Sequence, residues 1–364
     1  MRRTVAVAFI GWVWARVCVG AGFWVAHLLT PTPSMAARQD FPLPKGLLSW
    51  DGFFYRLIAE YGYVGTPKDG ARFFPLYPLI GRTLAPLVGG REDVALLVIN
   101  NAAALVGTVL LAQLAREVLA DVNGGDRAER VAIDTTWIIA VIPAALVFVF
   151  AYTEGLALCF TAAALLALHR RAFVWVGVFA ALAAGLRPTG LLLGVPILIE
   201  IVRVRPRPLR AVASLVGPVL GFLASAWFIQ RTTGNWFAPL DEQRPIRGDF
   251  RNPVIRVLES GWGLFHNTDT ELVPFVVLWG LLLLVSIRRR QPWSWIAFST
   301  VTLMVALSAD TIDSIGRYGM LAVPLVIALA QWADRRWRTT LVAVVGSVGL
   351  VIYTAQALQG RIVP

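Results

Sequence analysis

Asp51 is the residue of this chain whose type and position best fit a general base. It opens a stretch, residues 51–61, in which apolar side chains recur at i, i+3, i+4 and i+7, and this spacing predicts a short amphipathic helix. The carboxylate has two interpretations: it could cap the helix N-terminus, or it could accept a proton from a hydroxyl group held at the membrane surface. Asparagine caps as well as aspartate but accepts no proton, so the substitution Asp51→Asn separates the two.

Other polar groups accompany this predicted helix. We expect the helix to lie in the membrane interface with its aromatic side chains at headgroup depth. Arg56 and Glu60 lie one turn apart and are expected to pair, and Gly62 is expected to end the helix. Arg72 begins an aromatic segment, residues 71–79, whose prolines disfavour a regular helix at its start. Arg72 could pair with Asp51 or bind an anionic ligand, and the segment itself could be an interfacial or re-entrant anchor.

The elements that position these residues must belong to a polytopic membrane protein. Of the 364 residues 57% are hydrophobic and 15% are charged, and the mean hydropathy is +0.67. A soluble domain has about 45–50% apolar and about 25% charged residues, so a secreted domain, a cytosolic enzyme and a disordered tail are excluded. The net charge of +11 comes from arginines dispersed between apolar runs. Because they form no basic stripe interleaved with aromatics, no nucleic acid partner is indicated.

Metal and disulfide sites are not indicated either. Cys18 and Cys159 each lie inside an apolar run, and the three histidines are far apart in sequence. Zinc sites and disulfide frameworks need clustered ligands or thiols, and the sequence has no Asp-x-Asp pair that would invite a divalent cation. We therefore expect neither a metal ion nor a cofactor.

Apolar runs of spanning length define the predicted topology. Every second connection between them is short and rich in arginine, which the positive-inside rule assigns to the cytoplasm. The extracytoplasmic side then carries two long loops, residues 30–91 and 232–271, and three short turns. We expect one transmembrane domain over residues 1–364, with its chemistry in the outer loops. The eleven runs are residues 5–29, 92–119, 131–150, 156–169, 172–186, 188–202, 211–231, 272–287, 293–309, 318–333 and 339–357.

Two further polar signals bear on this arrangement. Asn252 before Pro253 predicts that a helix starts inside the second long loop, where it could cover a bound lipid or simply pack. Arg16 lies inside the first apolar run and is expected to face the interior of the helix bundle rather than lipid.

A series of short motifs resembles the GPI mannosyltransferase 2 (PIG-V) family and its bacterial relatives. The motifs occur in the family's order and span residues 50 to 318, on the side predicted to be extracytoplasmic. Ala151 departs from the family pattern, which has proline before the Tyr-Thr-Glu turn. The matching segments are Trp50-Asp51-Gly52, Ile58-Ala59-Glu60-Tyr61-Gly62-Tyr63, Phe73-Phe74-Pro75-Leu76-Tyr77-Pro78, Ala151-Tyr152-Thr153-Glu154-Gly155, Arg187-Pro188-Thr189-Gly190 and Ser314-Ile315-Gly316-Arg317-Tyr318.

The resemblance implies an all-α GT-C glycosyltransferase with an essential acidic residue in its first outer loop, which matches Asp51. It implies a polyprenyl-phosphate mannose donor and an acceptor that is a glycolipid, a lipoglycan or a protein. The frequent arginine and alanine are compatible with a high-GC bacterium, so we expect a bacterial plasma membrane and an active site on its extracytoplasmic side. The predicted substrate-binding residues are Trp50, Tyr55, Glu60, Tyr63, Arg72, Tyr77, Glu154, Arg187, Arg317 and Tyr318.

The chemistry of such a donor fits these residue types. A lipid phosphate leaves as an anion and needs no protonation, so one base is enough, whereas a glycoside hydrolase needs a paired acid. The leaving phosphate does need positive charge, and Arg72, Arg187 and Arg317 are the candidates. Each could instead reach to the interface or pair with an acid such as Glu154 or Asp313. Glu154 could also orient a sugar hydroxyl.

The main alternative is a lipid or small-molecule transporter. Transporters place ionisable residues near the bilayer midplane and are built from internal repeats. In this sequence the polar motifs gather on one predicted face, and we find no repeat between the halves. A nucleotide-using enzyme is disfavoured because the sequence lacks a P-loop or a Rossmann glycine pattern. We therefore favour an inverting, metal-independent mannosyl transfer with Asp51 as the base.

Overall fold

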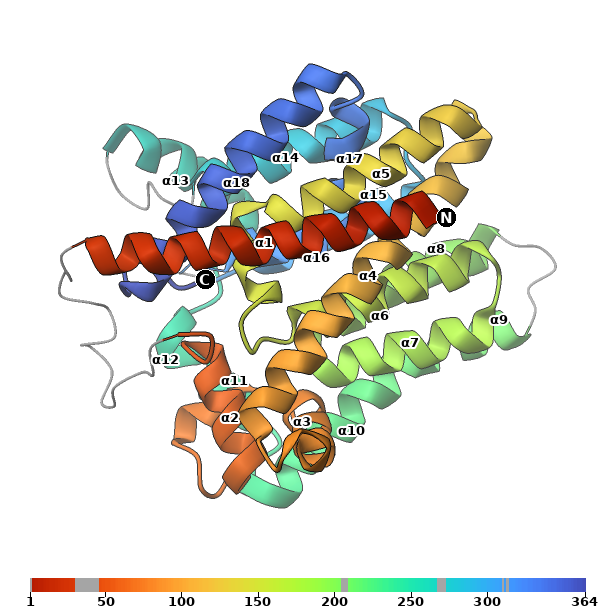
Figure 1. Ribbon diagram of the computed structural model, residues 1–364. Coiled ribbons are helices and arrows are strands. Elements are labelled where there is room, and N and C mark those ends of the chain that lie inside the picture. Colours follow the sequence, from red (N-terminus) through yellow and green to blue (C-terminus); the bar gives the residue numbers. More distant parts are fainter. Residues whose placement is uncertain (1, 30–45, 204–208, 267–272, 310, 312–313) are drawn as a thin grey trace.

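The structure is a computed structural model that describes residues 2–29, 46–203, 209–266, 273–309, 311 and 314–364. Within these ranges the chain is helical, with no β-strand and one isolated bridge between Phe250 and Ala309 (Figure 1). The predicted all-α class is confirmed. The α-helices are α1 (Arg2–Leu28), α2 (Asp51–Tyr61), α3 (Leu76–Leu84), α4 (Glu92–Asn123), α5 (Gly125–Val141), α6 (Glu154–His169), α7 (Phe173–Leu186), α8 (Gly194–Arg203), α9 (Leu209–Ala213), α10 (Val216–Thr233), α11 (Ala238–Asp241), α12 (Arg244–Arg247), α13 (Pro253–His266), α14 (Val273–Arg288), α15 (Trp293–Ala306), α16 (Ile315–Leu321), α17 (Val323–Trp332) and α18 (Arg336–Leu358). The described ranges also contain the 3₁₀ helices η2 (Lys68–Arg72), η3 (Ala85–Val88), η4 (Pro143–Phe148) and η5 (Pro188–Leu193).

Four described helical segments are long and apolar enough to cross a membrane, namely α1, α4, the α9–α10 segment Leu209–Thr233, and α18. The pair α16–α17 is a fifth if its two helices, bent by 80°, form one broken span. Each of the eleven predicted runs overlaps a described helix, but α6, α7, α14 and α15 have only 14–16 residues. Length and apolarity therefore support four or five spans, fewer than the eleven expected.

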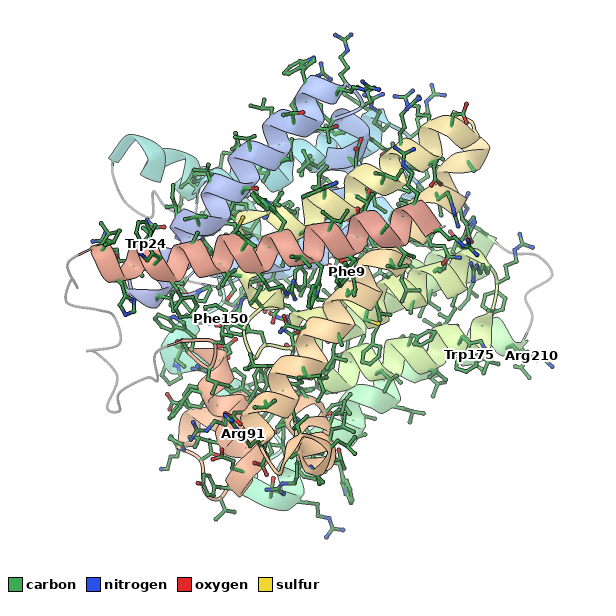
Figure 2. All side chains as sticks on the ribbon, in the orientation of Figure 1. Phe9, Trp24, Arg91, Phe150, Trp175 and Arg210 are labelled. Carbon is green, nitrogen blue, oxygen red and sulfur yellow. The ribbon has the colours of Figure 1, made fainter. Side chains whose placement is uncertain are left out.

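Many apolar side chains face outward. Phe9, Trp24 and Trp175 are 51%, 67% and 58% exposed (Figure 2). They belong to a large set of exposed aliphatic and aromatic side chains that covers α1, α7, α10, α14 and α18. A soluble monomer rarely exposes so much contiguous apolar surface, whereas lipid tails would cover it.

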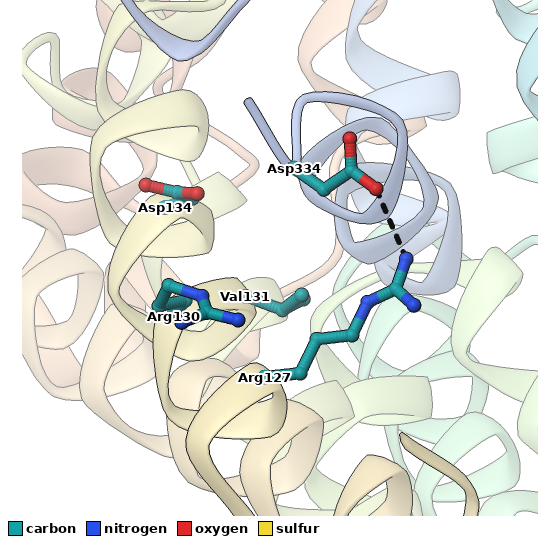
Figure 3. A pocket seen from close by; sticks show the side chains of 5 residues that line it. All are labelled: Arg127, Arg130, Val131, Asp134 and Asp334. Atoms are coloured by element: carbon teal, nitrogen blue, oxygen red, sulfur yellow. Dashed lines mark hydrogen bonds and ion pairs between the residues drawn. The ribbon is translucent and has the colours of Figure 1, made fainter. Parts of the chain in front are cut away.

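Asp334 joins several of the arginine-rich connections. Its Oδ2 accepts a hydrogen bond from Arg127 on α5 at 3.0 Å (Figure 3). The same oxygen accepts one from Arg289, directly after α14, at 3.5 Å, so both helices are tied to the α17–α18 connection. Arg170 likewise pairs with Glu117 at 2.6 Å, between the end of α6 and α4. Such half-exposed pairs are worth about 1 kcal/mol or less each. These arginines thus make contacts between helices.

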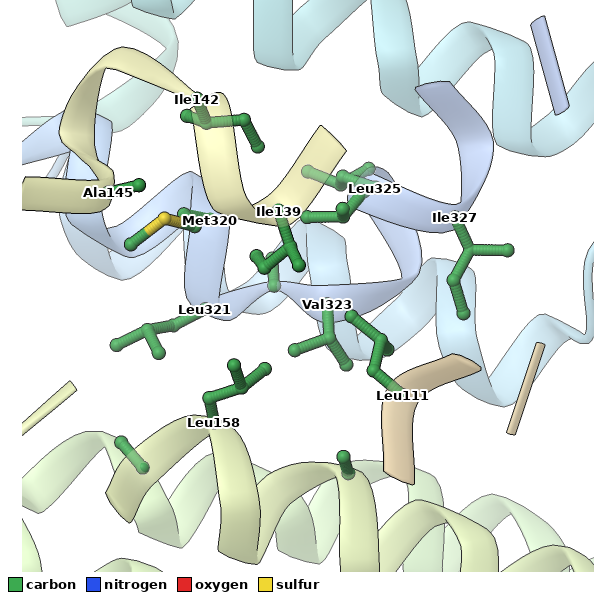
Figure 4. Close-up of a cluster of buried hydrophobic side chains, with 14 of the residues drawn as sticks. Leu111, Ile139, Ile142, Ala145, Leu158, Met320, Leu321, Val323, Leu325 and Ile327 are labelled. Atoms are coloured by element: carbon green, nitrogen blue, oxygen red, sulfur yellow. The ribbon is translucent and has the colours of Figure 1, made fainter. Parts of the chain in front are cut away.

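The core lies where α4, α5, α6 and the bent α16–α17 pair meet. Leu111, Ile139, Leu158, Val323 and Leu325 have no exposed surface and face one another there (Figure 4). The bend between α16 and α17 lies at Ala322, directly before Val323 and Pro324, and a proline in the first turn of a helix suits a chain that changes direction. The core thereby holds α16, which carries Arg317, against the N-terminal half of α6.

The backbones of α7 and α10 lie unusually close together. A Cβ atom added at Gly217 would overlap the backbone of Gly177, and one added at Gly221 would overlap the backbone of Ala181. The spacing Gly217-x-x-x-Gly221 is typical of membrane helices that pack through small residues. This contact fixes the position of α7. The helix ends before Arg187, because the proline that follows Arg187 favours an extended backbone at that residue.

The described part of the first long loop forms its own hydrophobic cluster, in which α2 and α3 pack against the start of α4 (Figure 1). The predicted pair of Arg56 and Glu60 is confirmed at 3.0 Å, and Gly62 ends α2 with its N–H donated to the Ile58 carbonyl. The predicted placement in the membrane interface is wrong for two of the four residues of the apolar face. Phe54 and Ile58 are 1% and 5% exposed because they pack against the protein, and Tyr61 of that face is exposed.

Candidate active site

Asp51 is the first residue of α2, and its side chain does not cap the helix. Trp50 occupies the N-cap position with φ 58°, and no side chain makes a capping hydrogen bond there. The carboxylate instead accepts a hydrogen bond from Arg317 Nη1, with 2.6 Å between Asp51 Oδ2 and the donor. The capping interpretation is therefore wrong, and the carboxylate takes part in a charged cluster.

The residues beside Asp51 fix its position. Trp50 Nε1 donates to the Ala357 carbonyl at 2.9 Å, which anchors the start of α2 to the end of α18. A Cβ atom at Gly52 would lie 3.2 Å from the Ala151 carbonyl oxygen, so glycine lets the turn before α6 approach closely. In turn, the Ala151 N–H donates to the Leu47 carbonyl at 2.9 Å. The Trp-Asp-Gly segment thus holds the carboxylate between α18 and the start of α6.

A chain of ion pairs continues from Asp51 into the protein. Arg317 also contacts Glu154 at 3.4 Å, and Arg187 pairs with the same Glu154 oxygen at 2.8 Å. The side chains of Arg317, Glu154 and Arg187 are 7%, 1% and 15% exposed. Charges this deeply buried persist only when they are paired. Glu154 therefore holds two arginines in place. Holding an arginine was one of the roles predicted for it, beside orienting a sugar hydroxyl.

Asn100 holds the turn that carries Glu154, and no sequence motif predicts this role. Asn100 on α4 donates to the carbonyls of Val147 and Phe150 at 2.8 and 2.7 Å, and its Oδ1 accepts the Gly155 N–H at 2.7 Å. The side chain has no exposed surface. A buried amide with three satisfied hydrogen bonds fixes the backbone of the turn, and hence the direction of Glu154.

Arg16 faces the bundle interior, as predicted. It donates to Asn101 Oδ1 and to the carbonyls of Trp12 and Phe148, at 2.8 and 3.2 Å for the carbonyls. Its guanidinium also lies 3.7 Å from the centre of the Trp12 ring. These contacts join α1 to η4 beneath the Glu154 turn.

Arg247 is a further arginine of the cluster, and the sequence analysis did not identify it. Its Nη2 donates to Ser314 Oγ at 3.0 Å, and Arg317 Nη2 donates to the same oxygen at 2.8 Å. The Tyr318 ring lies between two guanidinium groups, 5.2 Å from Arg187 and 5.4 Å from Arg247. One feature of the sequence could have pointed to Arg247. It lies in a loop predicted to be extracytoplasmic, where the positive-inside rule does not lead one to expect arginine.

Arg72 makes no ion pair within the described residues. Its guanidinium lies over two aromatic rings, 4.9 Å from Phe54 and 4.7 Å from Phe73. Its charge nevertheless acts on Asp51, and Asp69 in the same 3₁₀ helix offsets part of it. Of the three arginines predicted to bind phosphate, Arg187 and Arg317 are paired with acids, and Arg72 is the one whose charge is neutralised least.

The electrostatics keep Asp51 ionised. Burial by itself would raise the pKa of the carboxyl group, but the charges of Arg317, Arg72 and Arg187 outweigh that effect. The pKa of Asp51 therefore lies below the usual value of an aspartate. We call Asp51, Glu154, Arg72, Arg187, Arg247, Arg317 and Tyr318 the site cluster.

The other predicted substrate-binding residues lie around this cluster rather than in it. Tyr55 is buried against the rings of Phe73 and Tyr77, at 4.9 and 5.0 Å. The hydroxyl of Tyr63 donates to the Phe73 carbonyl at 2.6 Å, and that of Tyr77 donates to the Leu96 carbonyl at 2.8 Å. Trp50 and Glu60 are engaged with Ala357 and Arg56. The polar groups of Trp50, Glu60, Tyr63 and Tyr77 thus make contacts within the protein, and a role in substrate binding stays a prediction for them.

Two other expectations can be placed. The helix predicted to start at Asn252 is α13, and Asn252 Oδ1 accepts the Val254 N–H at 2.9 Å, which confirms the cap. Asp313, considered as a partner for the arginines, lies outside the described residues, as does the segment 30–45 of the first outer loop. Among the described side chains no group of three or more His, Cys, Asp or Glu residues could hold a metal ion.

No protein-family model matches the sequence, and no curated protein matches it. Solved structures do. ArnT from Cupriavidus metallidurans in the apo state matches with a TM-score of 0.55 and 16% identity, over 97% of this chain and 77% of that one. The same enzyme bound to undecaprenyl phosphate matches with a TM-score of 0.52 and 14% identity, over 98% and 76%.

An archaeal oligosaccharyltransferase also matches. AglB from Archaeoglobus fulgidus, in complex with an inhibitory peptide and a dolichol-phosphate, has a TM-score of 0.52 and 13% identity over 98% of this chain. This chain spans only 56% of the length of AglB. Identities this low establish a shared fold and not the PIG-V family, which remains a prediction. The chain is an integral membrane protein with the fold of the GT-C glycosyltransferases.

Proposed function

We propose that this protein is a glycosyltransferase that moves a sugar from a polyprenyl-phosphate donor to the hydroxyl group of an acceptor. The observation that carries the proposal is the pairing of Asp51 with Arg317 at 2.6 Å, inside a cluster of four arginines and two buried or half-buried acids. A base and a set of cations side by side are the two groups that this reaction needs.

The reaction assigns a separate task to each charge. The acceptor hydroxyl attacks the anomeric carbon, its proton passes to the Asp51 carboxylate, and the bond from the anomeric carbon to the phosphate oxygen breaks. The electron pair leaves with the lipid phosphate, whose charge grows from −1 in the diester to −2 in the monoester. Guanidinium groups that already surround the phosphate stabilise this added charge in the transition state. A single displacement of this kind inverts the anomeric centre.

The cluster offers suitable groups for the phosphate. Arg317, Arg187 and Arg247 converge around Tyr318 and Ser314, and Arg72 approaches from the first outer loop. The planar guanidinium fork suits phosphate oxygens better than an ammonium group does. Glu154 keeps Arg187 and Arg317 in place while leaving them further donors for a ligand.

The donor is proposed to be polyprenyl-phosphate mannose. The lipid phosphate is supported by two proteins of the same fold, ArnT bound to undecaprenyl phosphate and AglB with a dolichol-phosphate. Mannose rests on the resemblance of the motifs to the PIG-V family. The acceptor is a glycolipid, a lipoglycan or a protein, and we place the reaction on the extracytoplasmic side of a bacterial plasma membrane from the distribution of arginines.

A transporter for lipids or small molecules remains the second candidate. It would need ionisable residues along a path across the membrane. The site cluster lies instead where the N-terminal end of α6, the C-terminal end of α7 and the outer helix α2 meet, which favours chemistry at one end of the bundle.

The decisive experiment measures transfer from labelled polyprenyl-phosphate mannose in purified membranes. Asp51→Asn keeps the size of the side chain but removes the base, so transfer should fall by about 10²–10⁴-fold. Asp93→Asn is the matched control, because Asp93 loses the same charge and an ion pair with Arg91 outside the site cluster. Undiminished transfer by Asp51→Asn would refute the role of Asp51 as the base.

The proposed side of the membrane is tested separately. A single cysteine at Val64, which is 89% exposed, should react in intact cells with a maleimide that does not cross the membrane. A cysteine at Leu209, 83% exposed and next to Arg210, should react only after lysis. Both variants replace Cys18 and Cys159 by serine, and the reverse pattern of labelling would place the site cluster in the cytoplasm.

A further inference from the structure

A pocket of about 750 Å³ lies at the end of the helix bundle away from the site cluster. Helix α6 connects the two regions, because it begins at Glu154 in the site cluster and ends at His169 in the pocket wall. Sixteen residues of α-helix span about 22 Å. The pocket is therefore distinct from the proposed active site. Its walls come from the ends of α6, α8 and α14, the start of α15 and the second half of α4.

The pocket combines a basic rim with apolar walls. Arg171, Arg203 and Arg290 line it, and the acid among its lining residues, Glu200, already contacts Arg203 at 3.4 Å. The apolar lining residues are Val118, Leu119, Ile287, Pro292, Trp293 and Ile296. This combination suits a ligand with an anionic head and an apolar body.

A buried amide oxygen in the pocket lacks a donor. Gln291 is 4% exposed, and its Nε2 donates to the Pro324 carbonyl at 3.2 Å and to Gln331 Oε1 at 2.8 Å. Both partners are oxygen acceptors, so the atom that contacts them must be the amide nitrogen of Gln291. The amide oxygen is then the atom without a partner. Gln291 Oε1 has no hydrogen-bond partner in the part of the chain that the structure describes. A buried acceptor left unpaired is costly. The oxygen has almost no accessible surface, so a ligand in the pocket reaches it only when the Gln291 side chain turns toward the pocket.

Two arginines of the rim have an unusual backbone. Arg171 has φ 56° and Arg290 has φ 54°, and Trp50 beside Asp51 is the one further non-glycine residue with positive φ among the described residues. Each arginine follows the end of a helix, where glycine is the common residue. The Arg171 N–H donates to the Leu168 carbonyl and the Arg290 N–H to the Ile287 carbonyl, as such helix ends require. Arginine at both positions brings two positive charges to the same pocket despite its less favourable backbone.

We propose that this pocket binds an anionic glycerophospholipid whose headgroup carries a hydroxyl group, as phosphatidylglycerol does. Arg171 and Arg290 hold the phosphate, and the headgroup hydroxyl donates to Gln291 Oε1 after the Gln291 side chain has turned toward the pocket. The acyl chains leave along Ile287 and Trp293, which are 45% and 66% exposed and continue the apolar wall outward. The bound lipid comes from the membrane leaflet opposite the site cluster.

Binding is measured on the full chain purified in detergent, with native mass spectrometry and thermal unfolding as the readouts. Phosphatidylglycerol should give one retained lipid and a higher unfolding midpoint, since a ligand that binds the native state stabilises it. Phosphatidylcholine, which lacks both the net charge and the donor, should give neither. Equal binding of the two lipids would overturn the proposal, and so would an equal shift by glycerol 3-phosphate, which would identify a site for soluble phosphates.

The double variant Arg171→Gly, Arg290→Gly tests the rim without endangering the fold. Glycine adopts positive φ more readily than arginine, so the variant should unfold no earlier than the wild type without lipid. Its affinity for phosphatidylglycerol should fall at least about tenfold, because hydrogen bonds to charged groups are lost. The matched control, Arg335→Gln with Arg336→Gln, removes two exposed charges that do not line the pocket. Wild-type affinity in the glycine variant, or an equal loss in the control, would refute the assignment.

Discussion

Arg247→Gln is the most informative perturbation of the site cluster, because Arg247, like Arg72, pairs with no carboxylate in the described part of the chain and unlike Arg72 contributes little to holding Asp51 ionised. Its described contacts are a hydrogen bond to Ser314 Oγ at 3.0 Å and the face of Tyr318. Arg317 still donates to the same serine oxygen at 2.8 Å after the substitution. The fold should therefore be little affected, so that a change in transfer reports on the ligand.

The magnitude follows from the contact that would be lost. A hydrogen bond between a guanidinium group and an anionic phosphate contributes about 1.5–3 kcal/mol, which corresponds to roughly a 10- to 150-fold decrease in kcat/KM at 1.4 kcal/mol for each factor of ten. Part of the loss should appear in kcat, because the negative charge of the phosphate grows as the sugar leaves.

The assay is single-turnover transfer from polyprenyl-phosphate mannose, with thermal unfolding measured on the same preparations. Arg244→Gln is the matched control, since Arg244 lies on the same short helix and its side chain is exposed. A variant Arg247→Gln with wild-type kcat/KM and a wild-type unfolding midpoint would show that Arg247 does not contact the donor. The phosphate-binding set would then have to be reduced to Arg72, Arg187 and Arg317.

Three further outcomes follow from the structure. Glu154→Gln should lower the free energy of unfolding by about 3–5 kcal/mol, because it leaves buried guanidinium charge without its partner; an unchanged unfolding midpoint would contradict this. Gly221→Ala should destabilise the protein by about 1–3 kcal/mol through overlap of α10 with α7, whereas Gly280→Ala, which meets no neighbouring atom, should not destabilise it. In the pH profile, kcat/KM should fall on the acid side only below the usual pKa of aspartate, because Asp51 must be ionised and its pKa is lowered in the free protein. The fall of kcat on the acid side should lie at higher pH, because kcat reports the complex, in which the donor phosphate takes up part of the charge of Arg317. Two profiles that fall at the same pH would contradict the proposed contact between the phosphate and Arg317.

The motifs of the sequence identified most of the site cluster but not its pairing. Asp51, Glu154, Arg187 and Arg317 were all singled out, and the structure joins them across as many as 266 positions in the chain. Such a pairing depends on how α2, α6 and α16 meet, and a hydrophobic pattern carries no information about that. Arg247 was missed because it lies in none of the motifs, on the four-residue helix α12.

The sequence predicted the helical class correctly, whereas the described helices that are long and apolar enough to cross a membrane are fewer than the predicted spans. An apolar run shows that a segment is buried in lipid or protein, but it does not show which of the two. The same ambiguity explains the error about α2. The spacing of Phe54 and Ile58 predicts an apolar face, and in the structure the protein rather than lipid covers those two residues. The positions of the helix ends depend on local signals such as Pro188, which favours an extended Arg187.

Asp51 serves as a counterion within the site cluster. Buried guanidinium groups need counterions, and the Asp51 carboxylate supplies one to Arg317. A carboxylate held in this way has a lowered pKa and is a weak base. When a donor phosphate takes over part of the charge of Arg317 and Arg72, that attraction weakens and the pKa of Asp51 rises. In the proposed mechanism the donor would thereby turn Asp51 from a counterion into a stronger base at the moment when the acceptor hydroxyl must lose its proton.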